Sequence, residues 1–334
     1  MTFKFFYFVI LINLFFTKTF SQSEKIYVAW WNVENLFDTI DHVDNFPQKG
    51  NDDEFTPNGK NKWTSERYFQ KLENLSEIIS LMNDENCPDI LGICEVENES
   101  VLNDLIKKIG EKKSYKILYK ESPDLRGIDV AFIYDSKKIE KISFDYRSIN
   151  LGDSSLPTRD IVFAEFKMNE KNIIIIGNHW PSRRGGKEKS ESKRIIAAQT
   201  LKTLIDSILF SKPNSEIISM GDFNDTPNDI SIKDYLNASS EKTDLFNAMF
   251  ELEEKNLGSY LYNNEWDFID QMILTKTFFD NKNFEFETAN VFKKDFMFET
   301  EGKFKGAPFR TYGGEKYLGG FSDHLPIYVI LNLK

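Results

Sequence analysis

Five short apolar or aromatic runs of this chain are bordered by side chains that can bind metals or move protons. In chain order, these stretches are Trp30–Phe37, Ile93–Asn98, Gly177–Pro181, Gly221–Asp225 and Ser322–Pro326. Each places Asn, Glu, Asp or His where a buried-strand pattern ends or begins. An open α/β sheet carries its reactive groups at the ends of its strands. The pattern therefore predicts a sheet protein whose distant strands bring these side chains to one pocket.

The spacing of apolar residues divides the chain into strands and helices. Helical periodicity predicts helices over about 64–83, 99–109 and 188–210. Strand patterns occur at 26–31, 89–96, 115–120, 128–135, 141–149, 160–168, 172–178, 216–220, 258–262, 266–275, 284–292 and 325–333. No internal repeat and no Pro- or Ser-rich linker interrupts this order. We therefore expect one α/β domain over residues 22–334.

The first 21 residues have the pattern of a secretory signal peptide. Lys4 precedes the uncharged run Phe5–Phe16, which is shorter than the roughly 20 apolar residues that span a membrane. Thr19 and Ser21 then provide small residues for cleavage before Gln22. We expect a secreted or periplasmic protein with no stable membrane anchor after cleavage, and an uncleaved anchor is the alternative.

The charge and the cysteine content exclude several classes of protein. The chain has 53 acidic and 42 basic residues, a formal net charge of −11, which argues against binding nucleic acid by a broad basic surface. It does not exclude an enzyme that meets phosphates through bound cations. With only Cys87 and Cys94, no Cys₃ or Cys₄ metal site can form. We interpret both as free structural thiols, although export would allow them to oxidise.

Taken in order, the five motifs resemble those of the endonuclease/exonuclease/phosphatase superfamily, the DNase I-like metal-dependent phosphoesterases. The resemblance runs from Ile26 to about Leu331, nearly the whole mature chain. The stretches 179–186 (HWPSRRGG) and 310–324 (RTYGGEKYLGGFSDH) are similar to those of secreted bacterial members. The resemblance implies an α/β four-layer sandwich, in which two packed, mostly antiparallel β-sheets are flanked by helices. We expect a monomer.

The resemblance also implies a metal site. Asn32 and Glu95 should form the principal Mg²⁺ site, and Glu34 and Asp323 should bear on it or on a second ion, with Asp222 as a further candidate. Carboxyl and amide oxygens suit Mg²⁺, Mn²⁺ or Ca²⁺ better than zinc. Such cations neutralise the charge of a phosphate ester, which otherwise repels an attacking water.

Two of the three histidines of the chain lie in these motifs. By resemblance, His324, oriented by Asp270 or Asp222, contacts the scissile phosphate or takes a proton from water. His179 is its partner, donating to the phosphate or to the leaving oxygen. Which of the two is the acid and which the base stays open. Asp222 would also orient or activate the attacking water.

The remaining candidates surround this centre. Asn224 should hold a phosphoryl oxygen, and Asp129 is our candidate for steadying His179. The guanidinium groups of Arg183, Arg126 and Arg310 suit phosphate contacts. For every side chain named, a structural role as a solvated charge, a turn residue or a core residue is the alternative.

The loop from Asp38 to Lys62 is rich in acidic residues and is interpreted as a solvated rim, with an extra Ca²⁺ site as the alternative. Its spacing does not match an EF-hand loop. His42, in the same loop, is expected at the surface.

The leading functional interpretation is a secreted, divalent-metal-dependent phosphoesterase that cleaves phosphodiester bonds, acting as an endonuclease on DNA or RNA. The pair Asn178-His179 departs from the Tyr and Asn arrangement of the DNA-repair branch, so an apurinic-site enzyme is disfavoured. Two alternatives remain: a sphingomyelinase-like or inositol-phosphate phosphatase, and a binding protein that kept the fold and lost catalysis. A binding protein of this kind should lack one or more of the candidate metal-binding residues or histidines, and this chain retains all of them.

Overall fold

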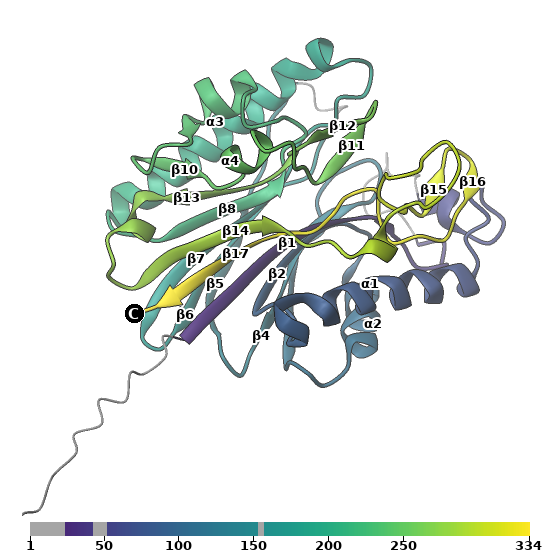
Figure 1. Ribbon diagram of the computed structural model, residues 1–334, viewed down its shortest axis with the longest axis horizontal. Coiled ribbons are helices and arrows are strands. Elements are labelled where there is room, and N and C mark those ends of the chain that lie inside the picture. The colour runs from purple at the N-terminus through teal and green to yellow at the C-terminus, as the bar shows by residue number, and fades with distance from the viewer. Residues whose placement is uncertain (1–23, 43–51, 153–156) are drawn as a thin grey trace, which may run out of the picture.

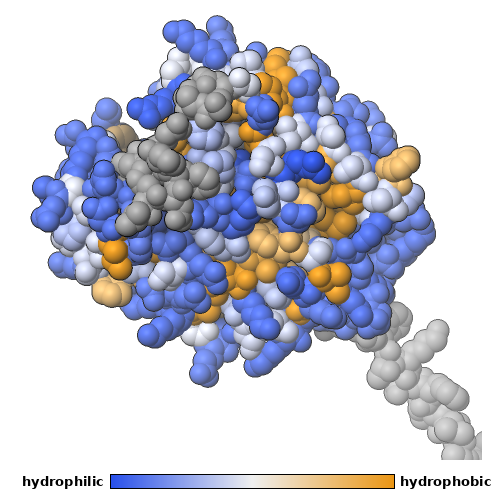
Figure 2. Space-filling view, turned by 180° about the vertical axis from the view of Figure 1, so that it is seen from behind, coloured by the Kyte–Doolittle hydropathy of each residue, from blue (hydrophilic) through white to orange (hydrophobic). Residues whose placement is uncertain are grey.

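The computed structural model describes residues 24–42, 52–152 and 157–334. The signal peptide expected over residues 1–21, and part of the acidic loop, lie outside these ranges. None of the helices in the described ranges is long and apolar enough to cross a membrane. Figure 2 shows one face of the molecule, on which hydrophilic residues predominate around a smaller hydrophobic area near the centre.

Two large sheets form the centre of the molecule (Figure 1). The six-stranded sheet has the order β14 (Phe284–Val291), β17 (Ile327–Leu333), β1 (Glu24–Leu36), β2 (Ile90–Val96), β4 (Asp129–Asp135), β3 (Tyr115–Tyr119). The seven-stranded sheet has the order β5 (Glu140–Arg147), β6 (Ile161–Met168), β7 (Lys171–His179), β8 (Ile217–Asp222), β13 (Asp270–Thr275), β10 (Leu245–Asn247), β9 (Ala238–Ser239). Neighbouring strands are antiparallel except in the pairs β1–β2, β7–β8 and β9–β10.

The other elements are helices and short hairpins. The α-helices are α1 (Ser65–Glu85), α2 (Glu99–Ile109), α3 (Lys187–Ser211) and α4 (Phe250–Glu253). Two hairpins are formed by β11 (Tyr260–Tyr262) with β12 (Glu265–Asp267) and by β15 (Tyr312–Gly313) with β16 (Lys316–Tyr317). Single helical turns lie at Asp52–Phe55, Ser231–Tyr235, Lys276–Phe279 and Asp295–Met297.

These elements stack in four layers, as the sequence predicted. The inner faces of the two sheets share one hydrophobic core, which the apolar sides of α1 and α2 extend over the outer face of the six-stranded sheet (Figure 1). A second core lies between α3 and the outer face of the seven-stranded sheet, where Leu201 and Leu204 pack near Ile174 and Ile176. The isoleucine run of β7 is thus covered on both faces.

The parallel pairs bring the motifs to one edge. In β1 and β2, Asn32 lies opposite Cys94, next to Glu95, and in β7 and β8 His179 lies opposite Asp222. Strand β8 also pairs with β13, where Asp222 faces Asp270. Gly221 permits the close approach of β7, because a Cβ atom at this position would lie 2.5 Å from the carbonyl oxygen of Asn178. Five segments far apart in the chain therefore end side by side.

The structure differs from the sequence prediction in two places near this edge. Strand β1 runs on to Leu36 instead of ending at 31, and Glu34 and Asn35 adopt positive φ angles of 51° and 60°, which marks an irregularity in the strand. The strand expected over 266–275 is split into β12 and β13 at residues 268–269. An apolar pattern alone does not reveal either interruption.

Candidate active site

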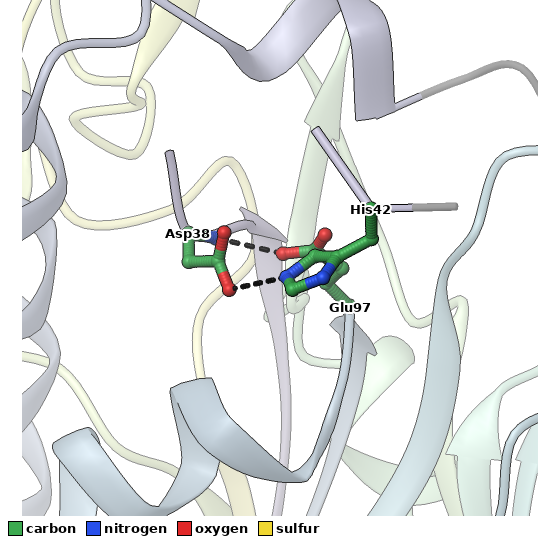
Figure 3. A group of neighbouring side chains, drawn as sticks. All are labelled: Asp38, His42 and Glu97. Atoms are coloured by element: carbon green, nitrogen blue, oxygen red, sulfur yellow. Dashed lines mark hydrogen bonds and ion pairs between the residues drawn. The ribbon is translucent and has the colours of Figure 1, made fainter. Parts of the chain in front are cut away.

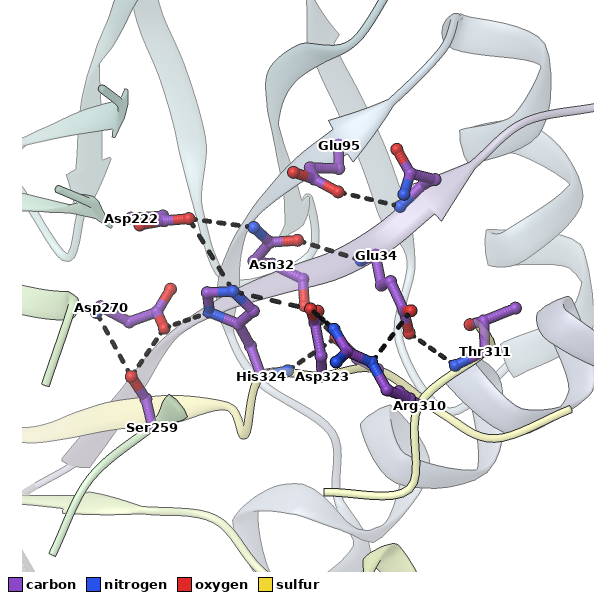
Figure 4. A network of polar contacts seen from close by, with 12 residues as sticks. Asn32, Glu34, Glu95, Asp222, Ser259, Asp270, Arg310, Thr311, Asp323 and His324 are labelled. Atoms are coloured by element: carbon purple, nitrogen blue, oxygen red, sulfur yellow. Dashed lines mark hydrogen bonds and ion pairs between the residues drawn. The ribbon is translucent and has the colours of Figure 1, made fainter. Parts of the chain in front are cut away.

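Asn32 connects the two sheets at the centre of the site (Figure 4). Trp30 and Asn32 lie on the same face of β1 because side chains alternate along a strand. The Trp30 indole donates to Asp270 Oδ1 at 3.0 Å, and Asn32 Nδ2 donates to Asp222 Oδ2 at 3.0 Å. Asn32 Oδ1 in turn accepts from the backbone amide of Glu34 at 3.0 Å. The face of β1 that fills the core thus also positions the site.

His324 is held by Asp270. Its Nδ1 lies 2.6 Å from Asp270 Oδ2, which also accepts from the Ser259 hydroxyl at 2.7 Å. Burial alone would lower the pKa of His324, but the adjacent Asp270 carboxylate raises it to about 10. Because Nδ1 is occupied, Nε2 is the nitrogen that faces the site, 4.0 Å from Asp222 Oδ2.

His179, the last residue of β7, also approaches the Asp222 carboxylate. Its Nε2 lies 3.7 Å from Asp222 Oδ2 and 3.8 Å from Glu95 Oε1. Burial, with the nearby Arg159 cation, lowers the pKa of His179 well below its usual value. Burial, reinforced by the charge of Asp270, raises the pKa of Asp222 to about 7. Two imidazoles with opposite pKa shifts therefore approach one buried carboxylate oxygen.

Glu95 ends β2 with its carboxylate toward the site. It has a positive φ of 64°, and its Oε2 accepts from the backbone amide of Asn35 at 3.2 Å. Its other oxygen, Oε1, lies 3.8 Å from both His179 Nε2 and Arg126 Nη1, beyond hydrogen-bond distance. This oxygen is available for a ligand.

Glu34 and Asp323 form a second pair of carboxylates beside Arg310. Glu34 accepts from the backbone amides of Thr311 at 2.6 Å and Tyr312 at 3.3 Å. Arg310 contacts Asp323 through Nη2, and its Nε lies 3.7 Å from Glu34 Oε1. Burial and the charge of Asp323 raise the pKa of Glu34 to about 7. The two acidic groups are close enough to repel one another, and one guanidinium separates them.

A family model named Endonuclease/Exonuclease/phosphatase family matches residues 27–333 of the chain. The protein belongs to this family. No curated protein sequence matches it significantly. The family assignment thus agrees with the resemblance of the five motifs, and members of the family are phosphoester hydrolases that depend on divalent metals.

Several solved structures of the family have the same fold. The catalytic domain of human Nocturnin with bound sulfate is 16% identical, with a TM-score of 0.56 over 93% of this chain and 95% of that one. D. rerio TDP2 with a single-strand DNA product is 13% identical, with a TM-score of 0.56 over 92% and 99%. The mannosyl-6-phosphatase of Bacteroides thetaiotaomicron is 15% identical, with a TM-score of 0.56 over 92% and 99%. At such identities these likenesses establish the fold alone.

The candidate ligands of the site have donor atoms that suit the divalent metal on which family enzymes depend. Glu34, Glu95 and Asp323 provide carboxylate oxygens and Asn32 an amide oxygen, all of which suit a hard cation. Burial, with the charge of Asp323, raises the pKa of Glu34, and a bound cation would favour the ionised form of this carboxyl. These donor types fit the metal that the family implies, and among the described residues Asp222, Asp270 and His324 form a group whose ligand atoms all lie within 4.8 Å of one another.

Lys71 is a buried member of the site that sequence reasoning missed. Its Nζ donates to Thr311 Oγ1 and to the Phe321 carbonyl, both at 2.6 Å. Burial lowers its pKa to about 8, although the charges of Glu34 and Asp323 favour the protonated form. The sequence does carry a signal for this buried lysine. Lys71 lies three residues after Tyr68 and four before Leu75, which places it on the buried stripe of α1.

Arg183, predicted to contact phosphate, makes hydrogen bonds within the protein through its guanidinium. Its Nε donates to the Asn224 carbonyl at 2.7 Å, and its Nη1 and Nη2 donate to Asp267 at 3.2 Å and Asp229 at 3.1 Å. Each of the three nitrogens makes a hydrogen bond, because the loop after β8 and strand β12 supply acceptors that the sequence order did not relate to Arg183. Asn224 itself has a φ of 52° and donates to the Trp180 carbonyl at 3.0 Å. Arg183 therefore supports the loop after β8.

Asp129 does not form the expected hydrogen bond with His179. Its carboxylate accepts from the Tyr119 hydroxyl at 2.6 Å and from the Ser122 amide at 2.8 Å. Within the part of the chain that the structure describes, the buried Nδ1 of His179 has no hydrogen-bond partner. His179 is instead held through its backbone, where its carbonyl accepts from Arg159 Nε at 3.1 Å.

His42 is exposed at the surface, as expected, and belongs to a small polar cluster. Its Nε2 lies 3.0 Å from Asp38 Oδ2, and the Asp38 amide donates to Glu97 Oε2 at 2.7 Å (Figure 3). The hydrogen bond with Asp38 raises the pKa of His42. One ligand atom of each of these three side chains lies within 4.8 Å of the others, a spacing that could hold a metal ion.

Proposed function

We propose that this protein is a divalent-metal-dependent phosphodiesterase that acts as an endonuclease on DNA or RNA. One observation carries the proposal: His179 and His324 approach Asp222 Oδ2 from two directions, at 3.7 and 4.0 Å, beside a set of oxygen donors. Carboxylates next to two imidazoles suit a reaction in which a charged phosphate is attacked by water.

The oxygen donors would hold the cation. Asn32, Glu34, Glu95 and Asp323 are the residues in question, and Mg²⁺ is the ion that we propose, with Mn²⁺ or Ca²⁺ as alternatives. When bound, such a cation neutralises the charge of the phosphate and polarises the phosphoryl group. Arg126, whose side chain is 43% exposed, can reach the phosphate from the rim beside Glu95.

The histidines and Asp222 would handle the protons. Asp270 fixes the imidazole of His324 so that Nε2 points into the site, and the Asn224 amide fixes Asp222 Oδ1 at 2.9 Å. The other oxygen, Asp222 Oδ2, which also accepts from Asn32 Nδ2, can accept a proton from the attacking water or orient it. His324 and His179 then serve as donor and acceptor on either side of the phosphate.

A polynucleotide is the substrate that we favour, because the related D. rerio TDP2 was solved with a single-strand DNA product. Sphingomyelin and inositol phosphates are the alternatives, and the related mannosyl-6-phosphatase shows that a protein of this fold can also act on a sugar phosphate. We also propose that the protein is secreted or periplasmic after loss of residues 1–21, and that it works as a monomer.

The decisive experiment is hydrolysis of bis(p-nitrophenyl) phosphate with Mg²⁺, with and without EDTA. We expect turnover that EDTA abolishes. A panel of plasmid DNA, RNA, sphingomyelin and inositol phosphates then ranks the substrates. Absence of metal-dependent turnover on every member would favour a binding protein on the same fold and refute the proposal.

A further inference from the structure

A cavity of about 470 Å³ opens next to the candidate active site. This volume lies within the usual range for small-molecule sites. The cavity lies between the β11–β12 hairpin and the segment that precedes Arg310. Its lining includes Tyr260, Tyr262, Lys303, Lys305, Arg310 and Asp323.

The cavity shares walls with the reacting centre. Arg310, which lines it, lies 3.7 Å from Glu34 through Nε, and Asp323, which also lines it, lies 3.9 Å from Nε2 of His324 (Figure 4). The ring centroid of Tyr260 lies 4.8 Å from that of His324. A substrate whose phosphate sits at His324 can therefore extend directly into the cavity.

The charge of the cavity is opposite to that of the molecule. Lys303, Lys305 and Arg310 line it together with one carboxylate, that of Asp323, whereas the whole chain carries a formal charge of −11. Arg310 is engaged by Asp323, so the two lysines are the cations left for a ligand. A cationic patch on an acidic protein favours an anionic ligand.

The aromatic side chains restrict the class of anion. Tyr262, which lines the cavity, is 58% exposed, and Phe304, which also lines it, is 38% exposed. Exposed aromatic rings beside lysines are the usual features of a surface that binds unpaired nucleotides, because bases stack on the rings while cations meet the backbone. Bases within a duplex are already stacked and cannot reach such rings.

We propose that this cavity holds the nucleotide next to the scissile phosphate, so that the substrate class of the site is single-stranded polynucleotide. The inference rests on the proposed function and deepens it. The base of that nucleotide stacks on Tyr262, and Lys303 and Lys305 contact the next phosphate of the strand. A compact inositol phosphate would use the lysines without the ring, and a lipid would need a larger apolar surface.

The test is binding of a fluorescently labelled single strand of about 12 nucleotides, measured by anisotropy in EDTA, which prevents cleavage. We expect the K303A/K305A protein to bind about 10-fold more weakly at about 0.1 M salt and its log–log salt slope to be smaller by about 1.4, the value for two phosphate contacts on a single strand. The control is K276A/K282A, two lysines with exposed side chains at the other end of β13, which should bind like the wild type.

The stacking role is tested with a strand that carries one abasic nucleotide. The wild type should bind it more weakly than the intact strand, and Y262A should lose that difference. Equal affinities of K303A/K305A and the control, a preference for duplex, or an abasic effect that survives in Y262A would each overturn the inference. Hydrolysis of bis(p-nitrophenyl) phosphate should be unchanged in the control K276A/K282A. Absence of metal-dependent hydrolysis of bis(p-nitrophenyl) phosphate by the wild type would instead count against the proposed function.

Discussion

Glu95 is the residue on which we expect metal binding to depend most. Glu95 Oε2 accepts a hydrogen bond from the backbone amide of Asn35. The other oxygen, Oε1, lies 3.8 Å from both His179 Nε2 and Arg126 Nη1. Glu95→Ala should abolish metal-dependent turnover and weaken Mg²⁺ or Mn²⁺ binding in titration calorimetry, with an unchanged circular dichroism spectrum. Glu111→Ala, at an exposed position, is the control. Wild-type turnover of Glu95→Ala at saturating Mg²⁺ would exclude Glu95 as a ligand.

The two histidines are expected to act in proton transfer, so His179→Ala and His324→Ala should each lower kcat by about 100-fold or more, the usual scale of general acid–base catalysis. Steady-state kinetics on bis(p-nitrophenyl) phosphate measures this. His42→Ala, which changes the histidine outside the site, should retain the wild-type kcat. A full rate in either site variant would return that histidine to a structural role.

At the scale of single residues, the sequence indicates which types of side chain are present more clearly than which contacts those side chains make. His324 and Asp270 are 54 positions apart, yet they contact one another as the motif resemblance implied. Arg183, by contrast, has side-chain chemistry that suits phosphate, but it lies beside the carboxylates of Asp229, in the loop after β8, and of Asp267, in β12. A side chain's type is written in the sequence, whereas its competing partners are set by the packing of other segments.

At the scale of elements, the close approach of β7 and β8 determines the geometry of His179 and Asp222. A Cβ at Gly221 would lie 2.5 Å from a backbone oxygen of Asn178, which cannot move without shifting the strand. Gly221→Ala should therefore lower the free energy of unfolding by about 1–3 kcal/mol and reduce activity. Urea denaturation measures the first effect, with Ser143→Ala on the exposed strand β5 as the control. Equal stability of both variants would show that the strands can separate freely.

The start of β8 has a buried acid that makes stability depend on pH. Burial raises the pKa of Glu216 to about 7, so the folded state holds this proton more tightly than the unfolded chain. Stability should thus be greatest below the unfolded pKa of about 4.5 and fall as pH rises through 7. Glu216→Gln should remove this loss and stabilise the protein by about 2 kcal/mol at pH about 8, with little change at pH about 4. Thermal unfolding across this range checks it, and a variant that is less stable at the higher pH would contradict the sign.

The boundaries of the elements were predicted best where periodicity is strong. The helix expected over 188–210 is observed as α3, Lys187–Ser211, because a long amphipathic stripe packs on the sheet. Short pairs such as β15 with β16 were missed, since two residues on a strand carry no periodic signal. The extension of β1 past Asn32 was also missed, because left-handed backbone at Glu34 interrupts the alternation.

At the scale of the whole molecule, the motif order predicted the fold class, and the two-sheet, four-layer arrangement is observed (Figure 1). The order of strands within each sheet could not be predicted, because most neighbours in the sheets are far apart in the chain. Strand β1, for example, pairs with the last strand, β17. Such pairings depend on which faces fit together, and local patterns do not record this.

The amino-acid sequence by itself determined which side chains are available for chemistry and that they stand at strand ends, because residue type and alternation are local properties. Only the tertiary structure decided which of them meet: His324 with Asp270, Arg183 with Asp229 and Asp267, and Lys71 with the carboxylates of the site. It also formed the cationic, aromatic cavity beside Arg310 from segments about 40 residues apart. Contacts, burial and electric fields arise from distances in space, which the linear order of residues does not contain.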